Sequence, residues 1–208
     1  MVNSDDVVCQ VAKSGDANND QWLGSRAISA QKANTANAFS LNADAGPLSA
    51  FPGLARSTAD LFSAVQPGGN LFGLQLSNPV DTRAAYQGNS NNYGDSKDPM
   101  VGSKIEGANV FSGGLGLYDE DGVLVGAVGV GGNTSCPDRH VAWRTRDALA
   151  LGSVPVGLSG AGLDSIIHNI ALDGDGHPVS ASRVGHPLCG FEEEVPAALL
   201  PTDFPIGP

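Results

Sequence analysis

The stretch at residues 110–131, VFSGGLGLYDEDGVLVGAVGVG, decides the fold of this chain. Two apolar runs, at 110–118 and 123–131, flank the turn sequence DEDG at 119–122, which is the pattern of an antiparallel hairpin. The second run is apolar at odd and even positions alike, and a strand with two apolar faces is covered on both sides. We therefore predict a β-hairpin whose second strand is central in a sheet.

Helical patterns lie on both sides of this hairpin in the sequence. Residues 25–40 read SRAISAQKANTANAFS, with Ser25 as the expected N-cap and small side chains that suit close packing on a sheet. Residues 139–151 follow the expected N-cap Asp138. Helices and hairpin together predict an α+β fold, an antiparallel sheet with packed helices.

Four further elements are predicted from local patterns. Residues 7–12 and 71–76 are short apolar runs that we expect to be strands, the second one buried. Residues 166–172 and 179–184 are expected to pair across the turn between them. Ser57 and Asp60 form a capping-box pattern, which predicts a helix start.

Composition limits the possible partners. The length of 208 residues favours one domain, and the net charge of −11 argues against nucleic acid and anionic membrane surfaces. No run of 18 apolar residues occurs, so we expect no membrane insertion. The start, MVNSDDVVCQ, lacks the segments of a signal peptide. Low Lys with abundant Asn, Ser and Gly is nevertheless typical of an exported protein, periplasmic or extracellular.

The three cysteines are Cys9, Cys136 and Cys189, and none forms a C-x-x-C pair. An odd number in an exported protein indicates one disulfide and one unpaired thiol, whereas a cytosolic protein would hold three buried thiols. We expect Cys9 to pair with Cys136, because the strand at 7–12 and the end of the central strand can lie side by side. Cys189 is then the unpaired residue.

The four histidines are His140, His168, His177 and His186. His140 falls in the first turn of a predicted helix, where the positive helix end disfavours the imidazolium, so we expect a neutral ring that can ligate iron. His168 alternates with isoleucines on a predicted strand and is expected to be half-buried. His177 and His186 each precede a proline and are expected to be exposed. Each one alone is more often structural than a ligand.

Several sequence blocks resemble the GlcG/HbpS family. They are QKANTANAF at 31–39, the hairpin at 113–131, CPDRHVAWRTRDAL at 136–149 and GHPLCG at 185–190. With QWLGSRAIS at 21–29 and QPGGNLFGLQLSNP at 66–79, they are most similar to a subgroup of exported haem-binding proteins. The resemblance covers about residues 2–190 and defines one domain at 1–190. Residues 191–208 then form a Pro-rich acidic tail.

The resemblance implies a profilin-like or PAS-like (GlcG-like) sheet with packed helices, and homo-oligomers. It implies haem as cofactor and partner, and haem degradation for some members. Relatives of this kind carry an earlier helix and strand and tend to carry a further cysteine near their start. We therefore expect this chain to lack the first helix and strand, which leaves a sheet edge unpaired.

The resemblance supplies no iron ligand, so the expected site comes from the residue types alone. An apolar slot would bury the porphyrin, with His140 as the first candidate for the iron ligand and His168 as the second. Lys32, Arg144 and Arg146 are the candidates for the propionates, because their charged groups pair with carboxylates. We assign no catalytic residue.

Two other functional classes stay open at this point. The first is a structural or sensory module that keeps the fold without a cofactor. The second is an enzyme acting on a small organic acid, which only the genomic company of some relatives suggests. A shifted Soret band on the purified protein separates haem binding from both.

Overall fold

The predicted hairpin forms the centre of the structure, a computed structural model that describes residues 1–45 and 53–207. Strands β2 (Gly114–Tyr118) and β3 (Leu124–Gly129) pair antiparallel. Strand β1 (Val2–Asn3) pairs with the other edge of β3, so the sheet order is β1-β3-β2. The second arm of the hairpin is therefore central, which confirms the expectation.

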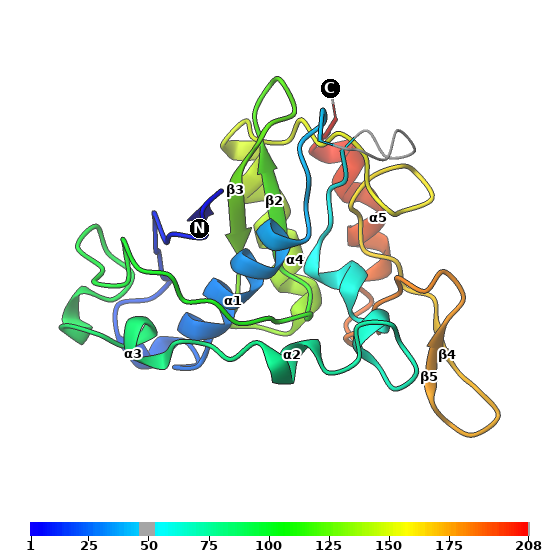
Figure 1. Cartoon of the computed structure of the whole chain (residues 1–208), viewed down its shortest axis with the longest axis horizontal. Helices are drawn as coiled ribbons and strands as arrows, with labels where there is room; N and C mark the ends of the chain where they lie inside the picture. The colour runs from blue at the N-terminus through cyan, green and yellow to red at the C-terminus, as the bar shows by residue number, and fades with distance from the viewer. Residues whose placement is uncertain (46–52, 208) are drawn as a thin grey trace.

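Two helices cover opposite faces of this sheet. Helix α1 (Ser25–Ala38) lies in front of the hairpin in Figure 1, and α4 (Ser135–Ala148) lies behind it. Ala127 of β3 packs with the alanines of α1, whereas its neighbour Val128 packs with Trp143 of α4. Successive side chains of a strand point to opposite faces. The mixed helix-and-sheet fold is thus the expected α+β class, with small antiparallel sheets.

Small residues allow α1 to approach the sheet closely. A methyl carbon built on Gly129 would lie 1.9 Å from the backbone oxygen of Ser29, and one on Gly114 would lie 2.4 Å from that of Lys32. The alanine-rich face of α1 contributes Ala33 and Ala36, both fully buried. The glycines of the hairpin therefore serve helix packing.

Both helices begin elsewhere than the sequence indicates. Gly24, not Ser25, is the N-cap of α1. Helix α4 begins at Ser135 after Thr134, which places Asp138 inside its first turn. There the Asp138 carboxylate accepts a hydrogen bond from the backbone N–H of Asn133, so it still satisfies a donor near the helix start.

Two predicted strands are wrong. Residues 71–76 enter a short helix, α2 (Leu74–Ser77), because Gly73 takes a left-handed φ of 90° and the backbone N–H of Leu76 bonds to Gly73. Leu76 is 88 % exposed rather than buried. Residues 7–12 form only isolated bridges, from Val7 to Lys104 and from Val8 to Val2.

The carboxyl-terminal segment, which we expected to be a tail, contains a helix that packs on the core. Helix α5 (Glu194–Asp203) packs against α4, burying Leu200. The indole N–H of Trp143 donates to the backbone oxygen of Phe204 at 2.9 Å. Residue 208 lies outside the described residues.

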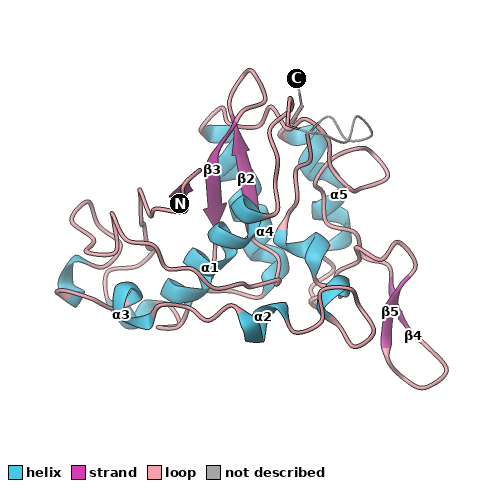
Figure 2. Ribbon diagram, in the orientation of Figure 1, coloured by secondary structure: helices cyan, strands magenta, loops and turns pink. Residues whose placement is uncertain are grey.

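The remaining elements are short, and Figure 2 shows long loops between them. Strands β4 (Ile170–Leu172) and β5 (Pro178–Ser180) pair as a second hairpin, which projects from the body at the lower right of Figure 1. Both are shorter than expected, and His168 lies before β4 rather than on it. The others are α3 (Thr82–Ala85) and the 3-10 helices Asn18–Asp20, Thr58–Leu61, Ser63–Val65 and Ser90–Asn92. Ser57 begins the second of these with the expected capping box.

Candidate functional site

A buried charge network lies between α4 and the segment before β4. Arg146 donates to both carboxylate oxygens of Asp164, and both side chains are fully buried. Arg139 donates to the backbone oxygen of Asp164, and Trp143 packs against both guanidinium groups. Burial alone would raise the pKa of Asp164, but the two arginines hold it below its ordinary value.

Asp60 lies at the edge of this network. Its side chain is fully buried, and burial raises its pKa to about 7 although Arg139 is nearby. Its Oδ2 accepts the backbone N–H of Ser57 at 3.0 Å. The site therefore holds a carboxyl group that changes charge near neutral pH.

A second buried ion pair joins α1 to α4. Lys32 lies 2.8 Å from Asp138 and also donates to the backbone oxygen of Val130. Burial lowers the pKa of Lys32 and raises that of Asp138, and each charge opposes the shift of the other. This ion pair lies at the end of β3, where it connects α1, α4 and the backbone that follows the strand.

Lys32 and Arg146, two of the expected propionate partners, are already engaged in these internal ion pairs. The side chain of Lys32 is 3 % exposed and that of Arg146 is 0 % exposed, and each charge is balanced by an internal carboxylate. A buried cation that leaves its partner exposes an uncompensated charge, which is strongly unfavourable. Lys32 and Arg146 are thus internal residues in this structure.

The disulfide corrects the expected pairing. Cys136 is bonded to Cys189, with Cα atoms 6.1 Å apart, and Cys9 is an exposed free thiol. Cys9 follows the bridges of residues 7 and 8, and its sulfur contacts the backbone oxygen of Met1. Cys136 instead lies in the first turn of α4, where the loop carrying Cys189 reaches it.

Glu193 fixes that loop. Its carboxylate accepts the backbone N–H groups of Cys189, Gly190 and Phe191. Burial acts in the opposite direction, but these hydrogen bonds lower its pKa to about 2. Three consecutive turn residues thereby bind one carboxylate, which positions Cys189 against α4.

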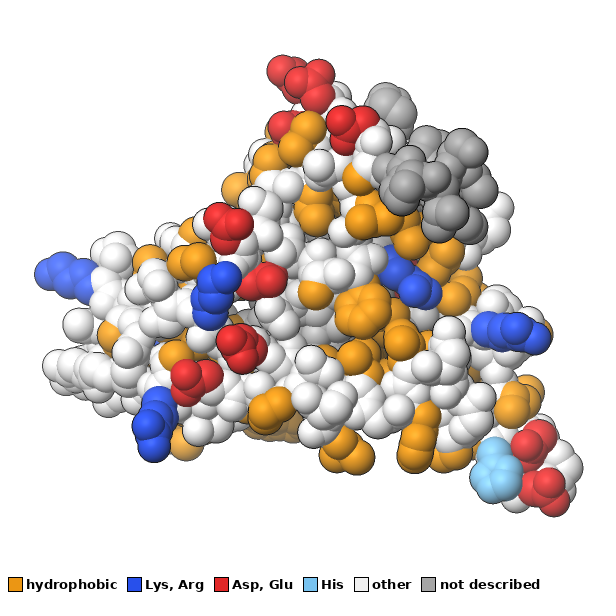
Figure 3. All heavy atoms as spheres, in the orientation of Figure 1, with side chains coloured by type: hydrophobic (Ala, Val, Ile, Leu, Met, Phe, Trp, Pro, Cys, Tyr) orange, Lys and Arg blue, Asp and Glu red, His pale blue; other side chains and the backbone are white. Residues whose placement is uncertain are grey.

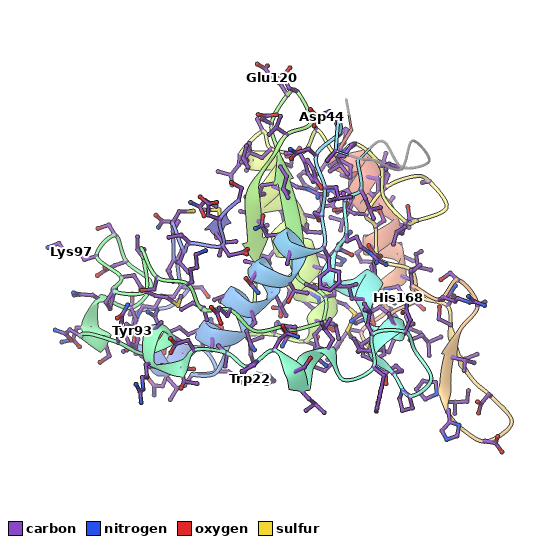
Figure 4. The ribbon with its side chains drawn as sticks, in the orientation of Figure 1. Trp22, Asp44, Tyr93, Lys97, Glu120 and His168 are labelled. Carbon is purple, nitrogen blue, oxygen red and sulfur yellow. A yellow bond between two sulfur atoms is a disulfide. The ribbon has the colours of Figure 1, made fainter. Side chains whose placement is uncertain are left out.

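Three histidines gather beside the disulfide, and we refer to His140, His168 and His186 as the histidine cluster. The rings of His168 and His186 meet edge to face, with centroids 6.3 Å apart, and His186 also packs on Phe62 at 5.2 Å. His140 on α4 is close enough for its charge to interact with that of His168. Figure 4 shows His168 on the right of the molecule, away from β2 and β3.

His186 is a structural member of the cluster. It is almost fully buried rather than exposed, and burial lowers its pKa to about 4. Its Nε2 accepts the backbone N–H of Ser112 at 3.3 Å, and Nδ1 lies 2.7 Å from the backbone oxygen of Pro187. A neutral ring protonated on Nδ1 satisfies both contacts. The sequence did not indicate this buried structural role, because a histidine that precedes a proline was expected to be exposed.

His140 and His168 have unused ring nitrogens. Nε2 of His140 and both ring nitrogens of His168 are buried and have no hydrogen-bond partner among the described residues. Burial and the neighbouring Arg139 lower the pKa of His140, so its ring is neutral at pH 7. A neutral imidazole with a free lone pair is a metal ligand.

Arg144 is the expected propionate partner that stays accessible. It is exposed and lies one turn after His140, on the same side of α4. Its guanidinium lies 5.3 Å from the ring centre of Phe204. The structure therefore brings His140, His168 and Arg144 to one side of α4.

The histidine cluster does not match a bare metal site. Among residues 1–45 and 53–207, the groups with three ligand atoms within 4.8 Å of one another are Cys136, Cys189, Glu193 and, separately, Asp173, Asp175, His177. The sulfurs of the first group are bonded to each other, and the second group is fully exposed on the β4–β5 turn. Tetrahedral zinc, which needs three or four converging ligands, is not favoured at the histidines.

Comparison of the sequence with models of known protein families gave no match, and neither did a search of the curated proteins. In the described part of the chain, no helix is both long and apolar enough to cross a bilayer. The fold and the site define an α+β protein with a disulfide-anchored histidine cluster.

Proposed function

We propose that this protein binds haem, with His140 and His168 as the candidate iron ligands. The observation that carries the proposal is the set of three buried ring nitrogens without hydrogen-bond partners in the described structure. Buried polar atoms normally have a partner, so an unused set in one place indicates an absent ligand. Haem iron needs only one or two protein ligands, and two histidines can supply them, whereas a bare metal ion needs three or more.

The charges around the cluster agree with this ligand. His140 is neutral at pH 7, as a ligating imidazole must be. Arg144 is exposed one turn away and remains free of an ion pair in the described structure, so it is the candidate for a propionate. Bound haem would supply iron-centred oxygen or electron-transfer chemistry. Scavenging and degradation are both uses of such a site.

Haemin titration of the purified protein tests the proposal. We expect saturable binding with a shifted Soret band, weakened by His140→Ala or His168→Ala and unaffected by His177→Ala on the exposed β4–β5 turn. Arg144→Ala should weaken binding less, because a partly exposed ion pair contributes about 1 kcal/mol or below.

Two results separate the parts of the proposal. A spectrum of free haemin under both oxidising and reducing conditions would overturn haem binding and favour a cofactor-free structural or sensory module. Full binding by the double variant His140→Ala/His168→Ala would overturn the ligand assignment alone.

The same proposal includes membership of the GlcG/HbpS family, which this chain resembles, and the profilin-like or PAS-like topology of that family. It also includes export of the protein and the formation of homo-oligomers. The disulfide supports an oxidising compartment, periplasmic or extracellular. Phe72 just before α2 and Leu76 within it are 65 % and 88 % exposed, and Figure 3 shows hydrophobic side chains along the lower edge of the molecule. Exposed apolar side chains that gather in one place are typical of protein interfaces.

A further inference from the structure

A cavity without histidines among its described lining residues lies beside α4, and Val141 and Thr145 line it from the helix that carries His140. Its volume is about 560 Å³, within the usual range of roughly 300–1,000 Å³ for small-molecule sites. It is bounded by the start of α1, the end of β3, one face of α4 and the loops at 10–14 and 86–94. In Figure 4, Trp22 and Tyr93 lie below and to the left of α1, whereas His168 lies on the right.

The cavity walls are mainly apolar. Four valines come from three different segments of the chain, and two exposed residues, Trp22 and Leu23, lie at its edge with 68 % and 64 % of their surface exposed. The apolar and aromatic lining residues are Val11, Val128, Val130, Val141, Trp22, Tyr86 and Tyr93. Apolar surface left open in a concave site favours an apolar ligand.

The charges in the cavity are of one sign. Lys13 and Arg26 are its charged side chains, and it contains no Asp or Glu among the described residues, although the whole chain carries 22 acidic residues. Because acidic side chains are twice as numerous as Lys and Arg in this chain, their exclusion from a cavity with 23 lining residues is informative. The cavity is therefore complementary to an anion.

Of the two charged side chains in the cavity, Lys13 has no carboxylate partner among the described residues. Its Nζ donates to the backbone oxygen of Asp16 at 3.0 Å and to Oδ1 of Asn18 at 3.1 Å, which are both neutral acceptors. Arg26, by contrast, is paired with both carboxylate oxygens of Asp98 and lies 3.7 Å from the ring centre of Tyr93. An anionic ligand would thus place its charge at Lys13.

We propose that this cavity binds an apolar carboxylate of the fatty-acid type, with the head group at Lys13 and the chain among the valines and Trp22. No histidine lines the cavity in the described structure, so this site is distinct from the proposed haem site. The Lys13 ammonium group can bind a carboxylate, and the valine side chains can pack against an apolar chain. The two features together favour a ligand that is charged at one end only.

Calorimetric titration with decanoate tests the proposal, with 1-decanol as the uncharged ligand of equal length. We expect saturable binding at one site for decanoate and weaker binding for the alcohol. Lys13→Gln should weaken decanoate about fivefold, the factor for about 1 kcal/mol from a partly exposed ion pair. Lys97→Gln is the matched control, since Lys97 is exposed at the far left of Figure 4.

Two further variants test the location. Val141 is 54 % exposed and Trp22 is 68 % exposed, so neither Val141→Asp nor Trp22→Ala should unfold the protein. We expect Val141→Asp to reduce decanoate binding more than tenfold, because it places a carboxylate in the cavity, and Trp22→Ala to reduce it less. Unchanged melting temperatures will show that both variants are folded.

Three outcomes would overturn this inference: no saturable decanoate binding, equal binding of decanoate by Val141→Asp and the unchanged protein, or displacement of haemin by decanoate. The His140→Ala/His168→Ala variant should bind decanoate normally. Loss of haemin binding in that variant with retained decanoate binding would support two separate sites, so the two proposals can fail independently.

Discussion

Arg146 donates hydrogen bonds of 2.6 and 2.9 Å to the two carboxylate oxygens of Asp164, and both side chains are 0 % exposed. The pair joins α4 to a loop that precedes β4. Desolvation of two charges offsets much of their attraction, so such a pair is more costly to break than it is stabilising to form. Its importance lies in fixing where the loop runs.

Breaking this pair should destabilise the protein strongly. Arg146→Met leaves Asp164 as a buried charge, and we expect the free energy of unfolding to fall by about 3–5 kcal/mol. The double variant Arg146→Met/Asp164→Leu should recover most of this loss, since it leaves neither charge behind. Urea unfolding at pH 7 measures all three proteins. Equal losses in the single and double variants would contradict the expectation.

Removing the disulfide should also be costly. Cys136 and Cys189 are 53 residues apart, and the loop-entropy relation gives a loss of about 4 kcal/mol for a loop of that length. Cys189→Ser should lower the free energy of unfolding accordingly. Cys9→Ser, at the exposed free thiol, should leave it unchanged. A destabilised Cys9→Ser variant would show that Cys9 has a structural role.

The pH dependence of stability should contain two opposing contributions. The pKa of Asp60 is raised by burial to about 7, so the folded protein keeps a proton there that the unfolded chain loses above pH 3.8, and stability falls as pH rises through that window. The pKa of His186 is lowered by burial to about 4. Between pH 4 and 6.5 the unfolded chain binds that proton and the folded protein does not, so stability rises with pH.

Asp60→Asn isolates the second contribution. The variant lacks the contribution of Asp60, which decreases as pH rises. Its free energy of unfolding should therefore increase more between pH 5 and pH 8 than that of the unchanged protein. Urea unfolding at the two pH values measures the difference, with Asp121→Asn in the exposed hairpin turn as the control. Parallel pH profiles for both proteins would mean that Asp60 is ionised in the folded state at pH 5.

The close approach of α1 to β3 predicts a steric effect. A side-chain carbon at position 129 would lie 1.9 Å from the backbone oxygen of Ser29, so Gly129→Ala should force α1 outward at a cost of roughly 1–3 kcal/mol. Gly174→Ala on the β4–β5 turn meets no atom within 4 Å and should be neutral. Thermal unfolding of both variants measures the difference, and equal melting temperatures would contradict the packing role of Gly129.

Patterns within one segment were predictive wherever the segment's own residues determine its conformation. The β2–β3 hairpin follows from two apolar runs around a turn, and α1 follows from a run of helix-forming small residues. Residues 71–76 show the limit, because an apolar run of six is compatible with strand and helix. There the left-handed Gly73 begins a helical turn.

The site was predictable only as residue types. The sequence indicated His140, His168 and a basic group at Arg144, and the structure brings these residues to one side of α4. It also places Lys32 and Arg146 in buried ion pairs, and a charged residue gives no sign in the sequence of whether it will be buried. The burial of the neutral His186 was missed as well, because a histidine before a proline gives no sign of being buried.

The sequence by itself determined the α+β class, the central hairpin, the helix that packs on it and the acidic, cysteine-containing character of the chain. Only the tertiary structure decided that Cys136 pairs with Cys189, that residues 194–203 complete the core, and that one cavity excludes acidic side chains. The physical reason is the distance along the chain over which each kind of interaction acts. Turns and periodicity act over a few residues, whereas a disulfide or an ion pair depends on which distant segments the packed core brings together.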